Sequence, residues 1–291
     1  MFQSLQEIVS ICEKEKKPFW QVILEDDCQE RKVTFNESFK KMKDTWDAML
    51  LAAVTYEKDR KSASGLVGGD GEKMEQYAGS HDTLCGSFLG EVMTGALQMG
   101  ESNACMKRIV AAPTAGACGV MPSVLVPYFR RINKNADKIV EALYVAAGIG
   151  QVIALRASIS GAQGGCQAEI GSASAMTAGA LVYLEGGGCG QIIHGAAMAL
   201  KNLLGLVCDP VAGLVEVPCV KRNVIGAVNA AAAAEMSLAG ITSKIPPDQV
   251  IDAMKEIGDK MDVSLRETGK GGLAATPAGK EIEEQLSQKL N

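Results

Sequence analysis

Three cysteines stand in settings that differ from that of an ordinary buried cysteine. Cys166 follows a run of glycines, where missing Cβ atoms let the backbone approach another group closely. Cys208 precedes Asp-Pro and Cys219 follows Pro218, so both are expected at breaks between helices. Three thiolates from such positions could hold a metal cluster that leaves one iron without a protein ligand. The alternative is three ordinary buried thiols in Gly/Pro turns, because free cysteine is often buried.

A second segment that could do chemistry is PTAGACG. Its residues Thr114, Ala115, Gly116 and Ala117 lie between prolines and before an apolar stretch, which predicts a tight loop that leads into a short helix. The N-terminus of a helix offers unpaired backbone N–H groups that suit a carboxylate. The segment is therefore either a structural turn or a cradle for a substrate carboxylate. It lacks the Gly-Lys-Ser/Thr ending of a phosphate loop, so nucleotide binding is not expected.

Four polar residues are further candidates. Arg222 and Asn223 directly follow the last of the three cysteines, and they could hold a carboxylate or order the cysteine loop. Lys270 has glycine neighbours in GKGGLA and could contact substrate. His81 is one of two histidines in the chain and, with Lys270, a candidate catalytic base. For each of them a surface salt bridge or a helix cap is the competing interpretation.

Helices are expected to position these residues. From Asp137 onward apolar residues recur at helical spacing in segment after segment, with no period-two strand of useful length. Residues 1–60 are the most charged part and predict surface helices, one of them with Asn36 as its N-cap. Residues 61–80, which include the turn sequence GGDG, predict a loop. The expected fold is all-α, with an N-terminal helical segment, 1–60, and a larger helical domain, 61–291, in one compact body.

Composition narrows the class of protein. Hydrophobic residues make up 47% of the 291 residues but aromatic residues only 4%, so small and aliphatic side chains must build the core. The net charge of −5 excludes the basic face of a nucleic-acid-binding protein. The N-terminus shows no secretory signal, which predicts a cytoplasmic protein with reduced thiols. The longest uncharged run, 109–129, is broken by prolines and is expected to be buried rather than to span a membrane.

Four motifs together resemble the iron–sulfur-dependent L-serine dehydratases, specifically their alpha subunit. The match runs from about Gly68 to Ala274 and its motifs are long and nearly contiguous, so it is specific. In that family the cysteines that match Cys166, Cys208 and Cys219 bind a [4Fe-4S] cluster inside an all-helical shell. The motifs are SISGAQGGCQAEIG, NLLGLVCDPVAGLVEVPCVKRN, PTAGACGVMP and RETGKGGLA.

The resemblance implies a reaction and a partner. The activity would be the deamination of L-serine to pyruvate and ammonia, with the iron that lacks a protein ligand acting as a Lewis acid on the hydroxyl group. The resemblance also favours the substrate-carboxylate role of the PTAGACG loop. Single-chain members of the family carry an additional domain with histidine motifs such as Ser-Ser-His-Thr, and no such domain is found in these residues. A separate beta subunit is therefore expected to complete the enzyme as a heterodimer.

Three other functions compete with this interpretation. The chain could be a non-catalytic iron–sulfur subunit or an electron carrier, which a fourth cysteine ligand such as Cys118 would favour. A pyridoxal-phosphate dehydratase would reach the same products, but no lysine lies in the serine-flanked setting of those enzymes. The same lyase chemistry could also act on another β-substituted amino acid. The cysteines outside the proposed ligand set are expected to be structural: Cys12, Cys28, Cys85, Cys105, Cys118 and Cys189.

Overall fold

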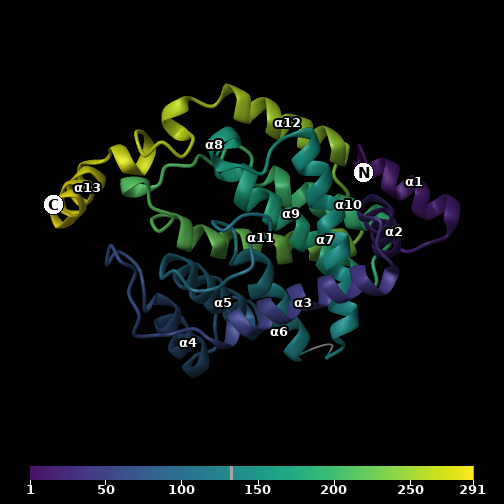
Figure 1. The fold of residues 1–291 in the computed structure, drawn as a ribbon, viewed down its shortest axis with the longest axis horizontal. Helices are drawn as coiled ribbons and strands as arrows, with labels where there is room; N and C mark the ends of the chain where they lie inside the picture. Colours follow the sequence, from purple (N-terminus) through teal and green to yellow (C-terminus); the bar gives the residue numbers. More distant parts are fainter. Residues whose placement is uncertain (132–133, 291) are drawn as a thin grey trace.

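The computed structural model describes residues 1–131 and 134–290, and every regular element in that part of the chain is a helix (Figure 1). The all-α prediction is confirmed, and the β-type pairing found there is an isolated bridge between Cys208 and Arg266. The elements are α1 (Leu5–Glu15), α2 (Phe19–Arg31), α3 (Phe35–Val54), α4 (Asp70–Ser80), α5 (Gly86–Ala104), α6 (Val120–Arg131), α7 (Ala136–Arg156), α8 (Gly161–Gly164), a π-helical turn η1 (Gln167–Gly171), α9 (Ser172–Leu184), α10 (Cys189–Lys201), η2 (Val211–Gly213), α11 (Cys219–Leu238), α12 (Pro247–Lys260), η3 (Val263–Leu265), η4 (Gly272–Ala275) and α13 (Pro277–Leu290).

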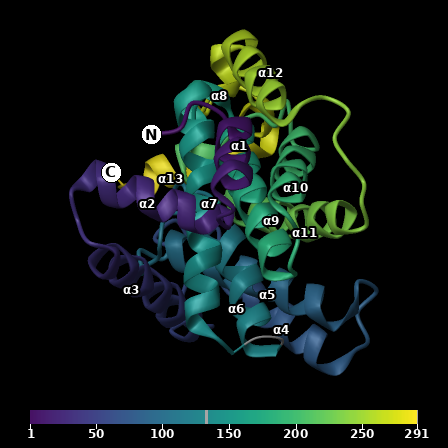
Figure 2. The same ribbon diagram turned by 90° about the vertical axis from the view of Figure 1, so that its right-hand side faces the viewer.

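The centre of the molecule is α9, which packs against α7, α10 and α11 (Figure 1, Figure 2). Every residue from Ser172 to Val182 is buried, and most of them are alanine, serine, threonine or glycine. Because these side chains are small, the helices approach closely, and a Cβ added to Gly179 would overlap the Ile149 side chain of α7. The core is therefore built from small and aliphatic side chains, as the composition predicts.

Among the described helices, α7 is long and apolar enough to cross a membrane, with a mean hydropathy of 1.5 in its most apolar window. However, 67% of that window is buried inside the molecule, where α7 packs against α2, α3 and α9. Burial of this kind is typical of a core helix. The uncharged run 109–129 forms a loop and most of α6, which is buried from Val120 to Tyr128.

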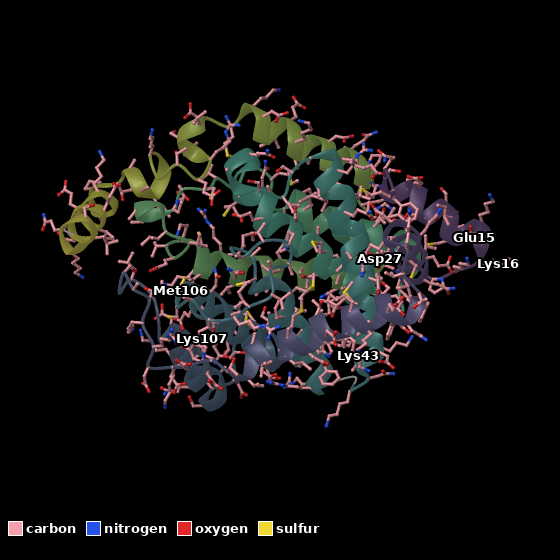
Figure 3. All side chains as sticks on the ribbon, in the orientation of Figure 1. Glu15, Lys16, Asp27, Lys43, Met106 and Lys107 are labelled. Atoms are coloured by element: carbon pink, nitrogen blue, oxygen red, sulfur yellow. The ribbon has the colours of Figure 1, made fainter. Side chains whose placement is uncertain are left out.

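The N-terminal helices expose charged side chains on one face and bury large apolar side chains on the other. Glu15, Lys16 and Lys43 lie on the outside of these helices (Figure 3), whereas Phe19 and Trp46 are at most 1% exposed. The prediction of surface helices therefore holds for one face of each, and the division of the chain at residue 60 stays a prediction.

The expected N-cap at Asn36 is wrong, because the N-cap of α3 is Thr34, two residues earlier, and the helix begins at Phe35. The Thr34 hydroxyl accepts a hydrogen bond from the backbone N–H of Glu37, and the Glu37 carboxylate accepts one from the backbone N–H of Thr34. This reciprocal capping box satisfies two donors at once, which a cap at Asn36 would not do.

The prediction of a loop over residues 61–80 is wrong for its second half, which forms α4. The backbone N–H groups of residues 69–71 all donate to the carboxylate of Glu101, over 2.7 to 3.3 Å. Glu101 belongs to α5 and is 1% exposed, so a buried anion from a distant segment caps this helix. Because the glycines of GGDG are typical of a turn, composition did not predict this helix. The motif forms the N-terminus of α4.

Candidate metal centre

Cys166 is fixed where a short helix gives way to a π-helical turn. The next residue, Gln167, donates its backbone N–H to Leu206 O over 2.9 Å. The Gln167 side chain accepts from Gly205 N over 2.9 Å and donates to Met254 O over 3.0 Å. This segment is therefore tied to the loop before Cys208 and to α12. A π-helical turn inside a helix is often a functional feature, because it redirects the side chains beside it.

Cys208 lies on an extended segment that is supported by the C-terminal part of the chain. Its backbone N–H donates to Leu265 O over 2.8 Å, and its carbonyl accepts from Glu267 N over 2.8 Å. The next residue, Asp209, is 3% exposed and accepts a hydrogen bond from Leu273 N over 2.8 Å. Residues far apart in the sequence thus hold the second cysteine in place.

Cys219 is the first residue of α11, and Asn223 connects it to the PTAGACG loop. The Asn223 amide donates to Cys219 O over 3.0 Å and to Gly116 O over 2.8 Å. Its side-chain carbonyl accepts from Gly119 N over 2.8 Å. Asn223 is 1% exposed, so these bonds are shielded from water. Asn223 therefore fixes the distance between the third cysteine and the loop predicted to bind substrate.

The fold brings two of the predicted cysteines together with one residue that the sequence analysis did not select, and Cys219 lies outside this group of three. One ligand atom each from Cys166, Cys208 and Glu169 all lie within 4.8 Å of one another. The Cys219 thiol interacts electrostatically with both other thiols. Cys166 and Glu169 are separated from Cys208 and Cys219 by α9 and α10, so the grouping is a property of the fold. Soft thiolates with a carboxylate form a ligand set that suits a transition metal.

The thiols of the group differ in how easily they lose a proton. A hydrogen bond from Cys208 lowers the pKa of the Cys166 thiol, and the nearby Arg222 guanidinium adds to this effect. The same bond, together with burial, raises the pKa of Cys208. Burial raises the pKa of Cys219 to about 12. Metal binding requires thiolates, so it would release protons from this group.

Arg222 lies among these groups, and two of its guanidinium nitrogens contact residues of the loop around Cys208. One guanidinium nitrogen forms an ion pair with Asp209 over 2.8 Å, and another donates to Val207 O over 2.7 Å. Although burial alone would lower the pKa of Arg222, the neighbouring Cys166 raises it. These contacts fix the segment on both sides of Cys208. Of the two roles predicted for Arg222, they favour the ordering of the cysteine loop.

Glu169 is enclosed by two glycines from different parts of the site. A Cβ added to Gly161 would lie 2.7 Å from its Oε2 atom, and one added to Gly116 would lie 3.2 Å from its Oε1 atom. Burial raises the pKa of Glu169, and the Thr114 hydroxyl partly offsets this effect. The sequence does contain a signal for this residue, since Glu169 is the one charged residue between Arg156 and Glu185.

The PTAGACG loop leads into α6 as a tight turn, as predicted. Cys118 N donates to Ala115 O over 3.2 Å, and α6 begins at Val120. The backbone N–H groups of Ala115, Gly116 and Ala117 donate to no acceptor in the described part of the chain. Three such donors before the start of a helix are suited to an anion. The structure places them beside Glu169 and therefore beside the cysteines.

The two candidate bases lie in different places. The Nδ1 atom of His81, which is exposed at the end of α4, is 3.1 Å from Tyr77 O, and its ring stacks on the Tyr77 ring at 4.6 Å. Lys270 is exposed in the segment that follows the pairing of Glu267 with Cys208. Neither side chain contacts the three thiols in the residues that the structure describes. Their catalytic roles stay predictions.

A comparison with protein families identifies the group to which this chain is related. The family model described as serine dehydratase alpha chain matches residues 14–274, a range that includes the three cysteines, Glu169 and the PTAGACG loop. The chain belongs to the serine dehydratase alpha chain family. The family resemblance predicted from the four motifs is confirmed.

Individual relatives support the same family over nearly the whole chain. The probable L-serine dehydratase alpha chain of Bacillus subtilis is 45% identical over 286 residues, which cover 98% of this chain and 95% of that protein. The L-serine dehydratase alpha chain of Peptoniphilus asaccharolyticus is 40% identical over 97% of both chains. L-serine dehydratase 2 of Escherichia coli is 46% identical over 181 residues, which are 62% of this chain and 40% of that protein.

Proposed function

We propose that this chain is the alpha subunit of an L-serine dehydratase, a carbon–nitrogen lyase that converts L-serine to pyruvate and ammonia. The observation that carries the proposal is the meeting of the Cys166 and Cys208 thiols with Glu169, beside the unpaired N–H groups around Gly116. Membership of the serine dehydratase alpha chain family supports the choice of reaction. Full-length similarity to proteins named L-serine dehydratase alpha chain supports the choice of substrate.

We infer that Cys166, Cys208 and Cys219 hold a [4Fe-4S] cluster. Thiolates are the usual ligands of such clusters, and the residues here fit that demand. The site gathers three thiols and the carboxylates of Glu169 and Asp209. Arg222 is the cation that forms an ion pair with this group in the described residues. Buried acidic groups are costly without positive partners, so the site favours a positively charged occupant.

The position of Cys118 argues against an electron carrier with four cysteine ligands. Its thiol is 1% exposed and donates to Met99 O over 3.7 Å. Burial raises the pKa of Cys118 to about 12. Unlike Cys219, Cys118 has no electrostatic interaction with the other thiols in the described residues. A cluster on the other three cysteines keeps one iron free for substrate.

The residues of the chain would divide the work of dehydration. When bound, the cluster supplies a Lewis acid that stabilises the departing hydroxyl group of L-serine. The backbone N–H groups of Ala115, Gly116 and Ala117 bind the substrate carboxylate. Asn223 holds this loop against α11, while Arg222 holds the segment around Cys208. The product enamine tautomerises and hydrolyses to pyruvate and ammonia without further help from the protein.

The Cα proton of serine is weakly acidic, so its removal requires a positioned base. In the described residues neither His81 nor Lys270 contacts the thiol group, and both are exposed. We therefore propose that a beta subunit docks over the cysteine face and supplies the base. The alpha chain names of the relatives support a partner of this kind. We also propose a cytoplasmic location, where the ligand thiols stay reduced.

The test is pyruvate formation from L-serine under anaerobic conditions, with iron measured in the same sample. We expect the isolated chain to bind about four irons and to form little pyruvate until the beta chain is added. L-threonine and L-cysteine as alternative substrates define the specificity. Full activity of the isolated, iron-loaded chain would contradict the role of the partner and point to His81 or Lys270. A chain that binds no iron would contradict the cofactor.

A further inference from the structure

The side chain of Glu169 is placed where a metal ligand would be. It follows Cys166 by one turn, on the π-helical segment η1. One of its carboxylate oxygens lies within 4.8 Å of the thiol sulfurs of both Cys166 and Cys208. A carboxylate this close to two cysteine ligands can reach an ion that those cysteines bind. Its oxygen is also a suitable ligand for iron, beside the softer sulfur ligands.

The surroundings of Glu169 contain no cation of their own for its carboxylate. In the described residues no lysine or arginine forms an ion pair with it, and the nearest guanidinium in the group, that of Arg222, is paired with Asp209. Gly161 and Gly116 close over the two carboxylate oxygens. A carboxylate enclosed beside thiols is unfavourable in its charged form unless a cation is present. The site is therefore complete only with a positive charge between Glu169 and the thiols.

The same carboxylate also borders the loop proposed to bind substrate. A Cβ added to Gly116 of that loop would lie 3.2 Å from Oε1 of Glu169, and the Thr114 hydroxyl lies next to the carboxylate. Glu169 thus lies between the cysteine ligands and the N–H groups of the loop. A substrate whose carboxylate binds the loop and whose hydroxyl group approaches the iron would have to displace it.

We propose that Glu169 is a fourth, displaceable ligand of the cluster iron that the three cysteines leave free, and that L-serine takes its place. This inference rests on the proposed function. The step is a ligand exchange, in which the bond between the carboxylate oxygen and iron breaks and a bond from a substrate oxygen forms. No electron is transferred and no co-reactant is needed. Without substrate, the carboxylate keeps solvent from the reactive iron.

The experiment is Mössbauer spectroscopy of anaerobic protein reconstituted with iron-57. In the wild-type protein we expect one iron in four to differ from the rest. Glu169→Gln should retain the same iron content but change the signal of that one iron, because an amide is a poorer iron ligand than a carboxylate. The matched control is Glu267→Gln, which removes a nearby charge from an exposed side chain that contacts Glu169 only electrostatically. Its spectrum should match that of the wild type.

A titration with L-serine provides a second readout. Because substrate no longer competes with an internal ligand, Glu169→Gln should bind L-serine several-fold more tightly in the spectroscopic titration. Identical spectra and affinities in Glu169→Gln and wild type would overturn the inference while leaving the cluster itself in place. A wild-type chain without iron would instead overturn the proposed function.

If Glu169→Gln fails to retain iron, Glu169→Asp gives the same comparison. Aspartate keeps the charge but its carboxylate is one methylene further from the iron. The inference expects full iron content with an altered signal for the one distinct iron. An unaltered signal in Glu169→Asp would overturn it.

Discussion

Glycine at position 116 matters because two groups of the site meet there. Its α-carbon faces the Glu169 carboxylate, and its carbonyl accepts the hydrogen bond from Asn223. A side chain at this position would point at Glu169, at a distance that already requires its neighbour to move. The loop therefore needs glycine for the close approach of its backbone and not for an unusual backbone angle, since Gly116 has no positive φ.

We predict that Gly116→Val raises the KM for L-serine about tenfold, equivalent to about 1.4 kcal/mol, with iron content unchanged. The added methyl groups crowd the backbone N–H groups that are proposed to bind the substrate carboxylate. Steady-state kinetics with the beta chain present measures this effect. Gly190→Val, at an exposed glycine of α10 where an added Cβ would meet nothing within 4 Å, is the matched control and should keep a nearly normal KM. A normal KM and kcat in Gly116→Val would show that the loop is only a turn.

At the scale of elements, a hydrogen bond between two free cysteines connects α1 and α10, outside the proposed metal centre. Cys189 is the first residue of α10, and Cys12 lies buried on α1. A hydrogen bond from the Cys12 thiol lowers the pKa of Cys189 to about 7. The start of a helix also favours a thiolate, because its backbone N–H groups are unpaired. This pair was predicted to be structural, and nothing in the pairing connects it with the reaction.

We predict that the rate of Cys189 alkylation by iodoacetamide rises with pH through a midpoint near 7. In Cys12→Ala the midpoint should move upward, toward the value of about 8.5 for a free thiol, because the thiolate loses its hydrogen-bond donor. Mass spectrometry of the labelled peptide follows the reaction. The exposed Cys85 in the same sample should label with the same pH profile in both proteins. An unchanged Cys189 profile in Cys12→Ala would contradict the assigned hydrogen bond.

Local sequence patterns predicted the helices from residue 137 onward, because long apolar segments recur there between glycine and proline residues. They did not predict α4, since its cap is the carboxylate of Glu101, about thirty residues further along the chain. The N-cap of α3 was a different kind of error. The sequence does contain the Thr34 and Glu37 pattern of a capping box, and the prediction of Asn36 did not take it into account.

In the site, too, local features could be predicted from the sequence, whereas contacts between distant residues could not. Glycine and proline mark the turns of the cysteines and of the PTAGACG loop in the sequence, but the choice of a metal site and a substrate loop over structural turns came from the family resemblance. The partners of Arg222 could not be predicted, since Asp209 and Val207 meet it only through the path of the chain before α11. Glu169 was missed because its importance depends on the π-helical turn that directs it toward Cys208.

At the scale of the whole molecule, the fold brings the segment of Cys166 together with the loop of Cys208 and Cys219, although complete helices separate the two in the sequence. Between Cys166 and Cys208 the chain passes through α9 and α10, and Cys208 is supported by residues beyond α12. Figure 1 shows α7, α10 and α11 around α9 at the centre of the molecule, and all three pack against it. The ligand set therefore exists only in the folded chain, so the cluster and the fold should stabilise each other.

The central claim is that Cys166, Cys208 and Cys219 together hold a [4Fe-4S] cluster, and the iron content of single Cys→Ser variants prepared without oxygen tests it most directly. We expect about four irons per chain in the wild type and loss of the cluster in each of these three variants. Cys118→Ser, which changes a buried thiol of the PTAGACG loop, is the matched control and should keep the full iron content. A stable cluster at full occupancy in Cys208→Ser would contradict the account.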